Sequence, residues 1–181
     1  ELLAANFPFV EIYATEWWDG SRTHEISAAD MAKASHFPTP TSVLAIGQIV
    51  RRPLPDQGLA KGLTLALDRV QDPGNVGTLL RIADWYALDR VVLSPECADL
   101  FSQKVINASK GSFARVAVHT ATLDTLLSHV PPTTPVLGCD LTGEDVHTLT
   151  PTSDAVIVIG SEGRGMSPEV KRTITQFVTI P

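Results

Sequence analysis

Two polar segments of this 181-residue chain combine reactive side chains with turn-forming residues. The first, residues 68–75, follows an apolar run and leads into an amphipathic stretch that contains Arg81. An arginine beside such a loop could hold a phosphate or a ribose through its fork of N–H donors. A purely structural interpretation is also open, in which Pro73-Gly74 forms a turn, Asn75 caps the following helix and Arg81 pairs with Asp84.

The second polar segment, residues 160–165, has the sequence Gly-Ser-Glu-Gly-Arg-Gly and precedes a helix start at Ser167-Pro168. Its glycines would let a ligand approach the backbone closely. The order G-x-x-G-x-G matches neither the dinucleotide fingerprint G-x-G-x-x-G nor a phosphate-binding loop that ends in GK[ST]. Ser161 is a weak candidate for a hydrolytic nucleophile, because the segment lacks the G-x-S-x-G pattern. Spacing alone therefore predicts an α/β domain with a glycine-rich ligand loop.

Alternating strand and helix patterns would hold both segments at one edge of a sheet. Strands are predicted at residues 63–67, 90–94, 116–120, 135–141, 155–161 and 176–180. Helices are predicted at residues 75–88, 102–110, 123–129 and 167–174. The first of these helices carries one apolar stripe, made of Val76, Leu79, Leu80, Ala83 and Ala87. This alternation predicts a mostly parallel sheet covered by helices, with ligands beyond the carboxyl ends of its strands.

A Pro- and Gly-rich stretch at residues 51–62 separates this region from a smaller N-terminal half. In that half, residues 9–15 and 43–50 are predicted strands, and a capping box at Ser27 opens a helix that runs to Ser35. A unit of about fifty residues is marginal for independent stability. We assign residues 1–52 to an N-terminal domain, 53–62 to a linker and 63–181 to the main α/β domain.

Composition excludes several classes of protein. Hydrophobic residues make up 44% of the chain, which is enough for a packed core and argues against disorder. No apolar run reaches the ~20 residues that a membrane-spanning helix needs, and no signal peptide is visible. The two cysteines and five histidines lack metal-ligand spacing. We therefore expect a cytoplasmic protein with no metal site and no membrane association.

The net charge of −6 counts against a dedicated nucleic-acid binder. The first 57 residues hold 4 basic and 7 acidic residues, and the remainder hold 10 and 13, so neither half is a basic module. Charged residues amount to 19% of the chain, below the typical quarter. We expect this shortfall to reflect a surface that is buried against a partner.

The two polar segments together resemble a known family. Residues 75–83 (NVGTLLRIA) and 158–166 (VIGSEGRGM) are similar to motifs 1 and 2 of the SpoU/TrmH-like RNA 2′-O-ribose methyltransferases of the SPOUT superfamily. Residues 104–113 (KVINASKGSF) resemble the stretch before that family's middle strand, and the likeness is nearly continuous from Leu63 onward. The N-terminal half resembles more loosely the L30e-like substrate-binding domain of many members.

This resemblance implies a SPOUT-type α/β fold with a parallel sheet and a C-terminal trefoil knot, preceded by a small L30e-like α/β domain. It also implies a methyl transfer from S-adenosyl-L-methionine to the ribose 2′-hydroxyl of tRNA or rRNA. Family members generally form homodimers through the catalytic domain. A homodimer interface of this kind would account for the low fraction of charged residues.

The resemblance also assigns site residues. Arg81 matches the family's catalytic arginine, Asn75 would fix the active-site loop, and Glu162 would orient Arg81 or act as a base. Because a guanidinium is effectively always protonated, Arg81 suits stabilisation of an incipient alkoxide better than proton removal. The implied cofactor-binding residues are Leu137, Gly138, Cys139, Gly160, Ser161, Glu162, Gly163 and Ile180. The candidate RNA contacts are Arg51, Arg52, Lys104, Lys110, Arg115 and Arg164.

The ends of the chain depart from the family pattern. The family's third motif begins with Ile-Pro and continues into the helix that completes the knot, whereas Ile180-Pro181 are the last residues here. Residues 1–3 resemble the end of a helix rather than the start of a protein. We therefore expect a longer complete protein, extended at both termini and less acidic per residue.

Two other functions stay open at this stage. A non-catalytic RNA-binding or assembly factor could keep the fold without methyl transfer, although Asn75, Arg81 and Glu162 are all present. A phosphate-ester-handling α/β hydrolase would need a nucleophile–base arrangement, which these loops do not offer.

Overall fold

The computed structural model describes residues 7–16, 23–55 and 57–181, and the chain divides into two compact units, Glu1–Val50 and Arg51–Pro181. The boundary lies two residues before the one that the sequence predicts. Arg51 pairs with Asp99 in the second unit, and the carbonyl of Arg52 lies 2.9 Å from Nδ1 of His119. The helix end expected at residues 1–3 lies outside the described residues.

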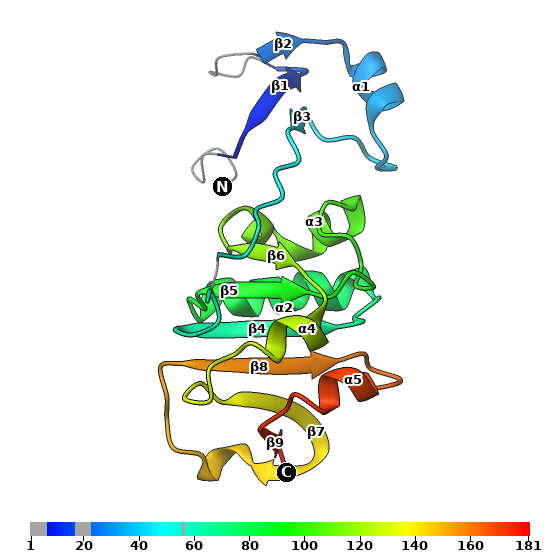
Figure 1. Ribbon diagram of the computed structural model, residues 1–181. Helices are drawn as coiled ribbons and strands as arrows, with labels where there is room; N and C mark the ends of the chain where they lie inside the picture. Colours follow the sequence, from blue (N-terminus) through cyan, green and yellow to red (C-terminus); the bar gives the residue numbers. More distant parts are fainter. Residues whose placement is uncertain (1–6, 17–22, 56) are drawn as a thin grey trace. The chain divides into compact units, whose positions relative to one another are not determined.

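The first unit is a three-stranded sheet with one helix (Figure 1). Its elements are β1 (Phe9–Ala14), β2 (Thr23–Glu25), α1 (Ala28–Ala34) and β3 (Val43–Gly47). β1 lies in the centre, parallel to β2 and antiparallel to β3. Ser27 caps α1 by accepting a hydrogen bond from the backbone N–H of Asp30, as its capping-box sequence predicts. The polar strand β2 was not predicted, because its three residues carry no apolar alternation.

The second unit is built on a parallel sheet with the strand order β6-β5-β4-β8-β7-β9. These strands are β4 (Leu63–Asp68), β5 (Arg90–Leu93), β6 (Val118–Thr120), β7 (Val136–Asp145), β8 (Ala155–Gly160) and β9 (Gln176–Thr179). The centre of the sheet consists of continuous apolar runs, as expected where both faces are covered. The predicted parallel α/β sheet is confirmed.

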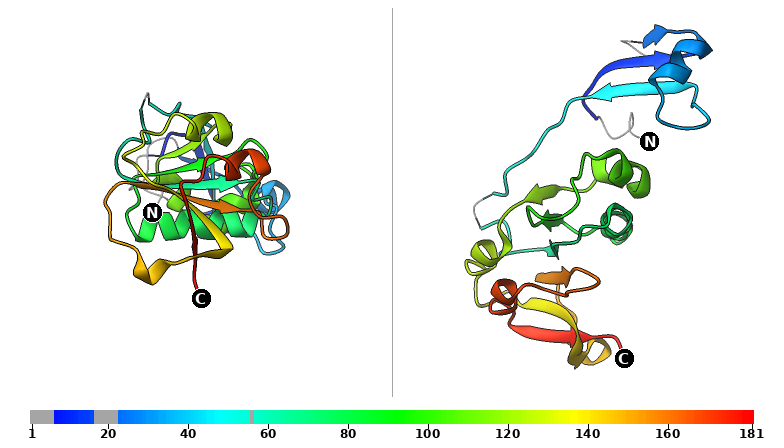
Figure 2. Two further views of the ribbon diagram at one scale, coloured as in Figure 1. Left: turned by 60° about the horizontal axis from the view of Figure 1, so that its bottom comes forward. Right: turned by 90° about the vertical axis from the view of Figure 1, so that its right-hand side faces the viewer.

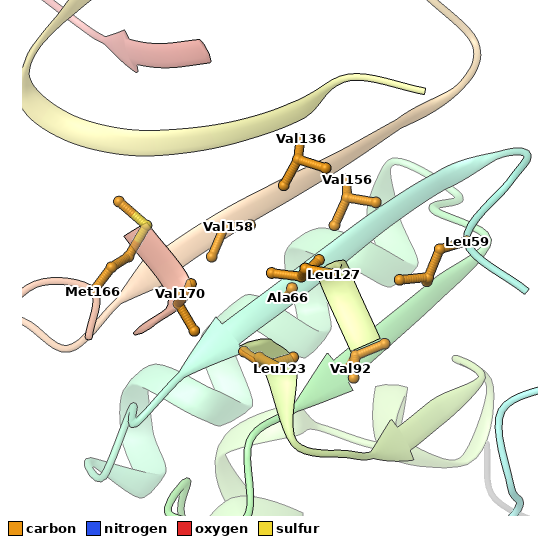
Figure 3. Packing of buried hydrophobic residues seen from close by; sticks show 10 residues of the cluster. All are labelled: Leu59, Ala66, Val92, Leu123, Leu127, Val136, Val156, Val158, Met166 and Val170. Atoms are coloured by element: carbon orange, nitrogen blue, oxygen red, sulfur yellow. The ribbon is translucent and has the colours of Figure 1, made fainter. Parts of the chain in front are cut away.

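Helices cover both faces of this sheet (Figure 2). They are α2 (Pro73–Trp85), α3 (Gln103–Ser109), α4 (Leu123–Leu127) and α5 (Pro168–Lys171), with short 3-10 turns at Ser112–Ala114 and Val146–Thr148. α2 and α3 pack together on one face, while α4 and α5 lie on the other. On the α4/α5 face, Val156 and Val158 of the sheet pack with Leu123 and Val170 of these helices (Figure 3).

The predicted linker at residues 53–62 is largely part of the second unit. Leu59 is buried in the hydrophobic core, and Leu54 packs against the same cluster. In this Pro- and Gly-rich stretch, Leu59 is therefore a core residue and Leu54 is a partly buried residue packed against the core. Their apolar surface is removed from water, which the spacing of prolines and glycines did not indicate.

Helix α2 starts and ends earlier than predicted. Its N-cap is Asp72, whose carboxylate accepts a hydrogen bond of 2.8 Å from the backbone N–H of Asn75. The predicted capping role of Asn75 is therefore wrong. The helix ends at Trp85, because Ala87 adopts a left-handed backbone with a φ of 50°. Ala87, the last residue of the predicted apolar stripe, therefore lies outside the helix.

The β7–β9 region departs most from the predicted boundaries. β7 continues to Asp145 instead of ending at residue 141, and its pairing with β9 shifts register between Cys139 and Glu144. Both of these residues face Val178, so the end of β7 bends around β9. α5 is shorter than predicted, because Thr175 then bonds through its hydroxyl and its N–H to Val136 of β7.

Candidate active site

The two polar loops begin side by side at the centre of the sheet. β4 and β8 are neighbours in register, with Asp68 opposite Gly160. Beyond the strands, the carboxylate of Asp68 accepts a hydrogen bond of 2.5 Å from the backbone N–H of Ser167. Asp68 is only 3% exposed. This buried bond joins the base of the first loop to the start of α5, which follows the second loop.

A second contact joins the same loops at their exposed ends. The side-chain amide of Asn75 donates to the carboxylate of Glu162 at 3.4 Å, across 87 residues of sequence. Because Asp72 is the N-cap, the Asn75 side chain is not held at the start of the helix by a capping bond. The structure therefore brings two of the three predicted catalytic residues together. Glu162 contacts Asn75 and makes no bond to Arg81 in the described part of the chain.

Arg81 lies exposed on α2, two turns after the start of the helix. Its predicted partner Asp84 is bound elsewhere, since that carboxylate accepts hydrogen bonds from Arg115 at 2.6 Å and from the hydroxyl of Ser112 at 2.8 Å. The guanidinium of Arg115 lowers the pKa of Asp84, with Ser112 adding to the effect. Among described residues Arg81 has no ion pair or hydrogen bond, so its charge is available to a ligand.

The glycine-rich loop is a tight reversal of the chain. Ser161 and Gly165 exchange two backbone hydrogen bonds, and Gly165 has a φ of 63°, which favours glycine. A Cβ at Gly160 would lie 2.2 Å from the backbone of Gly165 and Met166, so only glycine fits there. At Gly163, by contrast, a Cβ would meet nothing within 4 Å. The tip of the loop is therefore open to a ligand.

The predicted cofactor-binding residues lie on or directly after three neighbouring parallel strands, two of them at strand ends and three near the start of β7. Gly160 ends β8, Ile180 follows β9, and Leu137, Gly138 and Cys139 lie on β7 between them. A Cβ at Gly138 would come within 2.9 Å of Ile174 and 3.1 Å of Met166, so this position is closely packed. Desolvation raises the pKa of the Cys139 thiol, which keeps it protonated near neutral pH.

An ion pair ties this edge to α5. Lys171 donates a hydrogen bond of 2.9 Å to Asp140, the residue after Cys139. The Lys171 ammonium lowers the pKa of Asp140, so this carboxylate stays ionised at neutral pH. The pair links the end of the glycine-rich region to the bend in β7.

The candidate RNA contacts do not form one patch of free cations. Arg51 pairs with Asp99 at 2.7 Å and lies over the ring of Phe101, and Arg115 is held by Asp84. The remaining four are exposed and lie on three different segments of the second unit: Arg52, Lys104, Lys110 and Arg164. Ion pairing therefore occupies two of the six predicted contacts.

Sequence reasoning missed the residues that hold the loops. Asp68, Asp72 and Ser167 were given no part in the site, although each is a polar residue next to a strand end or a helix start. A polar residue that directly follows a buried strand was the available signal. In the described ranges, no group of three His, Cys, Asp or Glu side chains could hold a metal ion. None of the helices described is long and apolar enough to cross a membrane.

Comparison with known proteins shows which family the chain resembles in sequence. Residues 62–181 match the model of the SpoU rRNA Methylase family. An uncharacterized tRNA/rRNA methyltransferase from Synechocystis is 31% identical over 172 residues, which cover 86% of this chain and 58% of that protein. A 23S rRNA (guanosine(2553)-2′-O)-methyltransferase from Bacillus subtilis is 29% identical, with coverage of 81% and 58%. The chain thus spans less than two thirds of the length of these curated relatives.

Solved structures of RNA methyltransferases have a similar fold. A TrmH-family protein from Porphyromonas gingivalis superposes with a TM-score of 0.86 at 34% identity, covering 99% of this chain and 76% of that one. An AdoMet-bound rRNA methyltransferase from Sinorhizobium meliloti shares the fold, with a TM-score of 0.87 at 23% identity and coverage of 99% and 74%. On the family model, the relatives and the fold, this chain belongs to the SpoU/TrmH-like RNA methyltransferases of the SPOUT superfamily.

Proposed function

We propose that the chain transfers a methyl group from S-adenosyl-L-methionine to a ribose 2′-hydroxyl of tRNA or rRNA. The observation that carries this proposal is the contact between Asn75 and Glu162, which joins the two family motifs at one sheet edge. The Bacillus subtilis relative, a guanosine 2′-O-methyltransferase, supports the choice of the ribose hydroxyl. The AdoMet-bound neighbour supports the choice of donor.

The residues present fit the donor. The open tip at Gly163 and the glycine-only position Gly160 form a backbone cradle directly after β8, which pairs with the first residues of β7. Leu137, Gly138, Cys139 and Ile180 would complete the donor site, with Ser161 and Glu162 of the loop. When bound, S-adenosyl-L-methionine supplies an electrophilic methyl group on a sulfonium. The raised pKa of the Cys139 thiol favours a role for its main chain over nucleophilic attack.

Arg81 would act on the acceptor side. Methyl transfer needs a more nucleophilic oxygen than a neutral ribose hydroxyl, and a fixed cation stabilises the charge that develops there. Arg81 carries its charge without a bonded carboxylate among the residues described here, so the charge is not neutralised before the substrate binds. Glu162 is our candidate proton acceptor, and Asn75 positions it by hydrogen bonding.

The proposal also includes a trefoil knot, a homodimer and an L30e-like first unit. The bend of β7 around Val178 of β9 supports a trefoil knot, because a Cβ on Gly143 would lie 2.5 Å from the backbone of Val178. The exposed Ile82, Trp85 and Tyr86 on and beside α2 support a homodimer, since apolar side chains of this size favour burial. We assign the first unit to an L30e-like domain that contacts RNA.

The test is transfer of tritiated methyl from S-adenosyl-L-methionine to total tRNA and rRNA of a strain that lacks the enzyme. Labelled RNA should yield alkali-resistant dinucleotides, because a 2′-O-methyl group blocks cleavage of the adjacent phosphodiester. Label in a base would overturn the ribose assignment. Absence of both transfer and donor binding in calorimetry would favour the non-catalytic RNA-binding or assembly factor.

A further inference from the structure

A cleft of about 210 Å³ opens at the carboxyl edge of the second unit, beside the starts of α4 and α5. Asp68, Ser94 and Ser167 are buried lining residues, and Leu123 and Val170 add apolar surface. None of the cofactor-binding residues predicted above lines it. The cleft nevertheless shares Asp68 and Ser167 with the base of the two active-site loops.

Arg69 is the cationic side chain in the lining. Its backbone has a φ of 57°, in the left-handed region that costs energy for a residue with a Cβ. The backbone N–H donates to the hydroxyl of Ser94 at 3.0 Å. The buried Nε has no hydrogen-bond partner, and the nearest carboxylate oxygen, on Asp68, lies 3.7 Å away. The Nε atom itself is inaccessible, but the Arg69 side chain is 33% exposed, so the rest of its guanidinium can donate hydrogen bonds to a ligand in the cleft.

The charge of the cleft excludes a phosphate as that ligand. Besides Arg69, the lining contains the carboxylates of Asp68, Glu96, Asp124 and Glu169. Four carboxylates against one guanidinium leave the cleft acidic, which repels the RNA backbone. The ligand must therefore offer hydrogen-bond donors to carboxylates and acceptors to an arginine, without a negative charge.

Among RNA bases, guanine meets this requirement fully. Its O6 and N7 are adjacent acceptors that suit the arginine fork, and its N1–H and 2-amino group are adjacent donors that suit a carboxylate. Adenine and cytosine offer a donor amine but lack the second adjacent donor. Uracil offers N3–H between two carbonyl oxygens, so a carboxylate there would face repulsion.

We propose that this cleft binds a guanine base of the RNA substrate, with Arg69 and the rim carboxylates reading its edges. The inference rests on the proposed function for its substrate class. A volume of about 210 Å³ is below the ~300–1,000 Å³ of sites for whole drug-sized ligands, so the cleft suits one base rather than a cofactor. Pro95, Leu123 and Val170 would contact the ring faces of an unstacked base.

The experiment titrates the chain with guanosine, inosine, adenosine and cytidine and follows backbone amide shifts by NMR. Guanosine should bind about ten-fold more tightly than adenosine, since a bidentate pair discriminates by a factor of this order. Inosine, which lacks the 2-amino group, should fall between them. The largest shifts should map to Ser94, Leu123 and Val170, and equal binding of all four nucleosides would overturn the proposal.

Two variants make the test specific. Arg69→Gly removes the guanidinium and relieves the left-handed strain, so the protein should fold while guanosine affinity falls about ten-fold. Glu169→Gln, at an exposed position, should weaken guanosine binding while Arg172→Gly, outside the cleft, should not. Unchanged guanosine affinity in Arg69→Gly would contradict the assignment. A further titration uses lysine amide as a probe for cationic peptides, and tighter binding of lysine amide than of guanosine would also contradict it.

Titration of the same samples with S-adenosyl-L-methionine separates this inference from the proposed function. Guanosine binding without donor binding would refute the methyltransferase proposal and support the base site. Donor binding without a preference for guanosine would refute the base site and support the methyltransferase proposal. Wild type and Arg69→Gly should bind the donor equally, because Arg69 lies outside the predicted donor residues.

Discussion

The two contacts that join the active-site loops differ in burial and in geometry. Asp68 and the N–H of Ser167 meet at 2.5 Å beneath the surface, whereas Asn75 and Glu162 meet at 3.4 Å on it. A buried acceptor is costly to leave without its donor, while an exposed one can bond to water. The comparison suggests a division in which the base holds the loops and the tip performs chemistry. Changes at the tip should then affect turnover, and changes at the base should affect stability.

The largest expected effect lies near the tip, at Arg81. Arg81→Ala should lower methyl transfer by about 100-fold or more, the usual cost of removing a group that stabilises a developing oxyanion. Its stability should stay within about 0.5 kcal/mol of wild type, because the side chain is exposed and has no partner in the described chain. Steady-state transfer assays and urea unfolding measure the two quantities.

The matched control for Arg81 is Arg172→Ala, which removes an exposed arginine at the end of α5. It should retain near-normal turnover and donor binding. Near-normal turnover in Arg81→Ala would remove Arg81 from the mechanism. Loss of donor binding in that variant would show instead that Arg81 belongs to the cofactor site.

At the base, Asp68→Ala should lower the free energy of unfolding by about 1–3 kcal/mol, because the buried N–H of Ser167 loses its acceptor. Asp68→Asn keeps an acceptor oxygen and should recover most of that loss. Urea titrations of the three proteins provide the measurement. If Asp68→Ala were as stable as wild type, the division between base and tip would fail.

A smaller effect is expected for the tip contact itself. Asn75→Ala breaks the bond to Glu162 and should lower turnover by about five-fold, the equivalent of one modest hydrogen bond of ~1 kcal/mol. Its backbone N–H still bonds to the Asp72 cap, so the melting temperature should barely change. A large loss of stability with unchanged turnover would reverse the assignment of Asn75 to the tip.

The sequence predicted the sheet and the positions of the loops because apolar periodicity records burial directly. Apolar runs located the six strands of the sheet in the second unit, and the family motifs are the basis on which Asn75, Arg81 and Glu162 are proposed as site residues. Contacts across long stretches of sequence leave no such record. Asp84 pairs with Arg115 and not with Arg81, because the Ser112–Ala114 turn lies beside α2. No local sequence pattern indicates where that turn lies.

Leu54 and Leu59 illustrate the same limit. The prolines and glycines around them indicated a segment without a regular helix or strand, as the structure shows for the residues it describes there. Burial depends instead on which residues lie next to the segment in space. Asn75 shows a second limit, since Asp72 and Asn75 are both good helix caps and differ by a single turn. Local propensity could not choose between them, and that choice decides whether the Asn75 side chain is held by a capping bond or extends from the first turn of α2 toward Glu162.

The smallest expected effect tests the half-buried pair that leaves Arg81 unbonded. The guanidinium of Arg115 lowers the pKa of Asp84, so the pair contributes stability above the unfolded-state pKa of ~3.9 and loses it as the pH falls through the folded value. Asp84→Asn should therefore be less stable than wild type by about 0.2–1 kcal/mol at pH 7. The difference should begin to shrink below about pH 4, where Asp84 of the unfolded chain takes up a proton, and should be lost once the pH falls below the lowered pKa of the folded protein. A stability difference that persists in acid would show that Asp84 acts through packing and not through its charge. The absence of a bond between Arg81 and Asp84 could then not be attributed to the ion pair between Asp84 and Arg115.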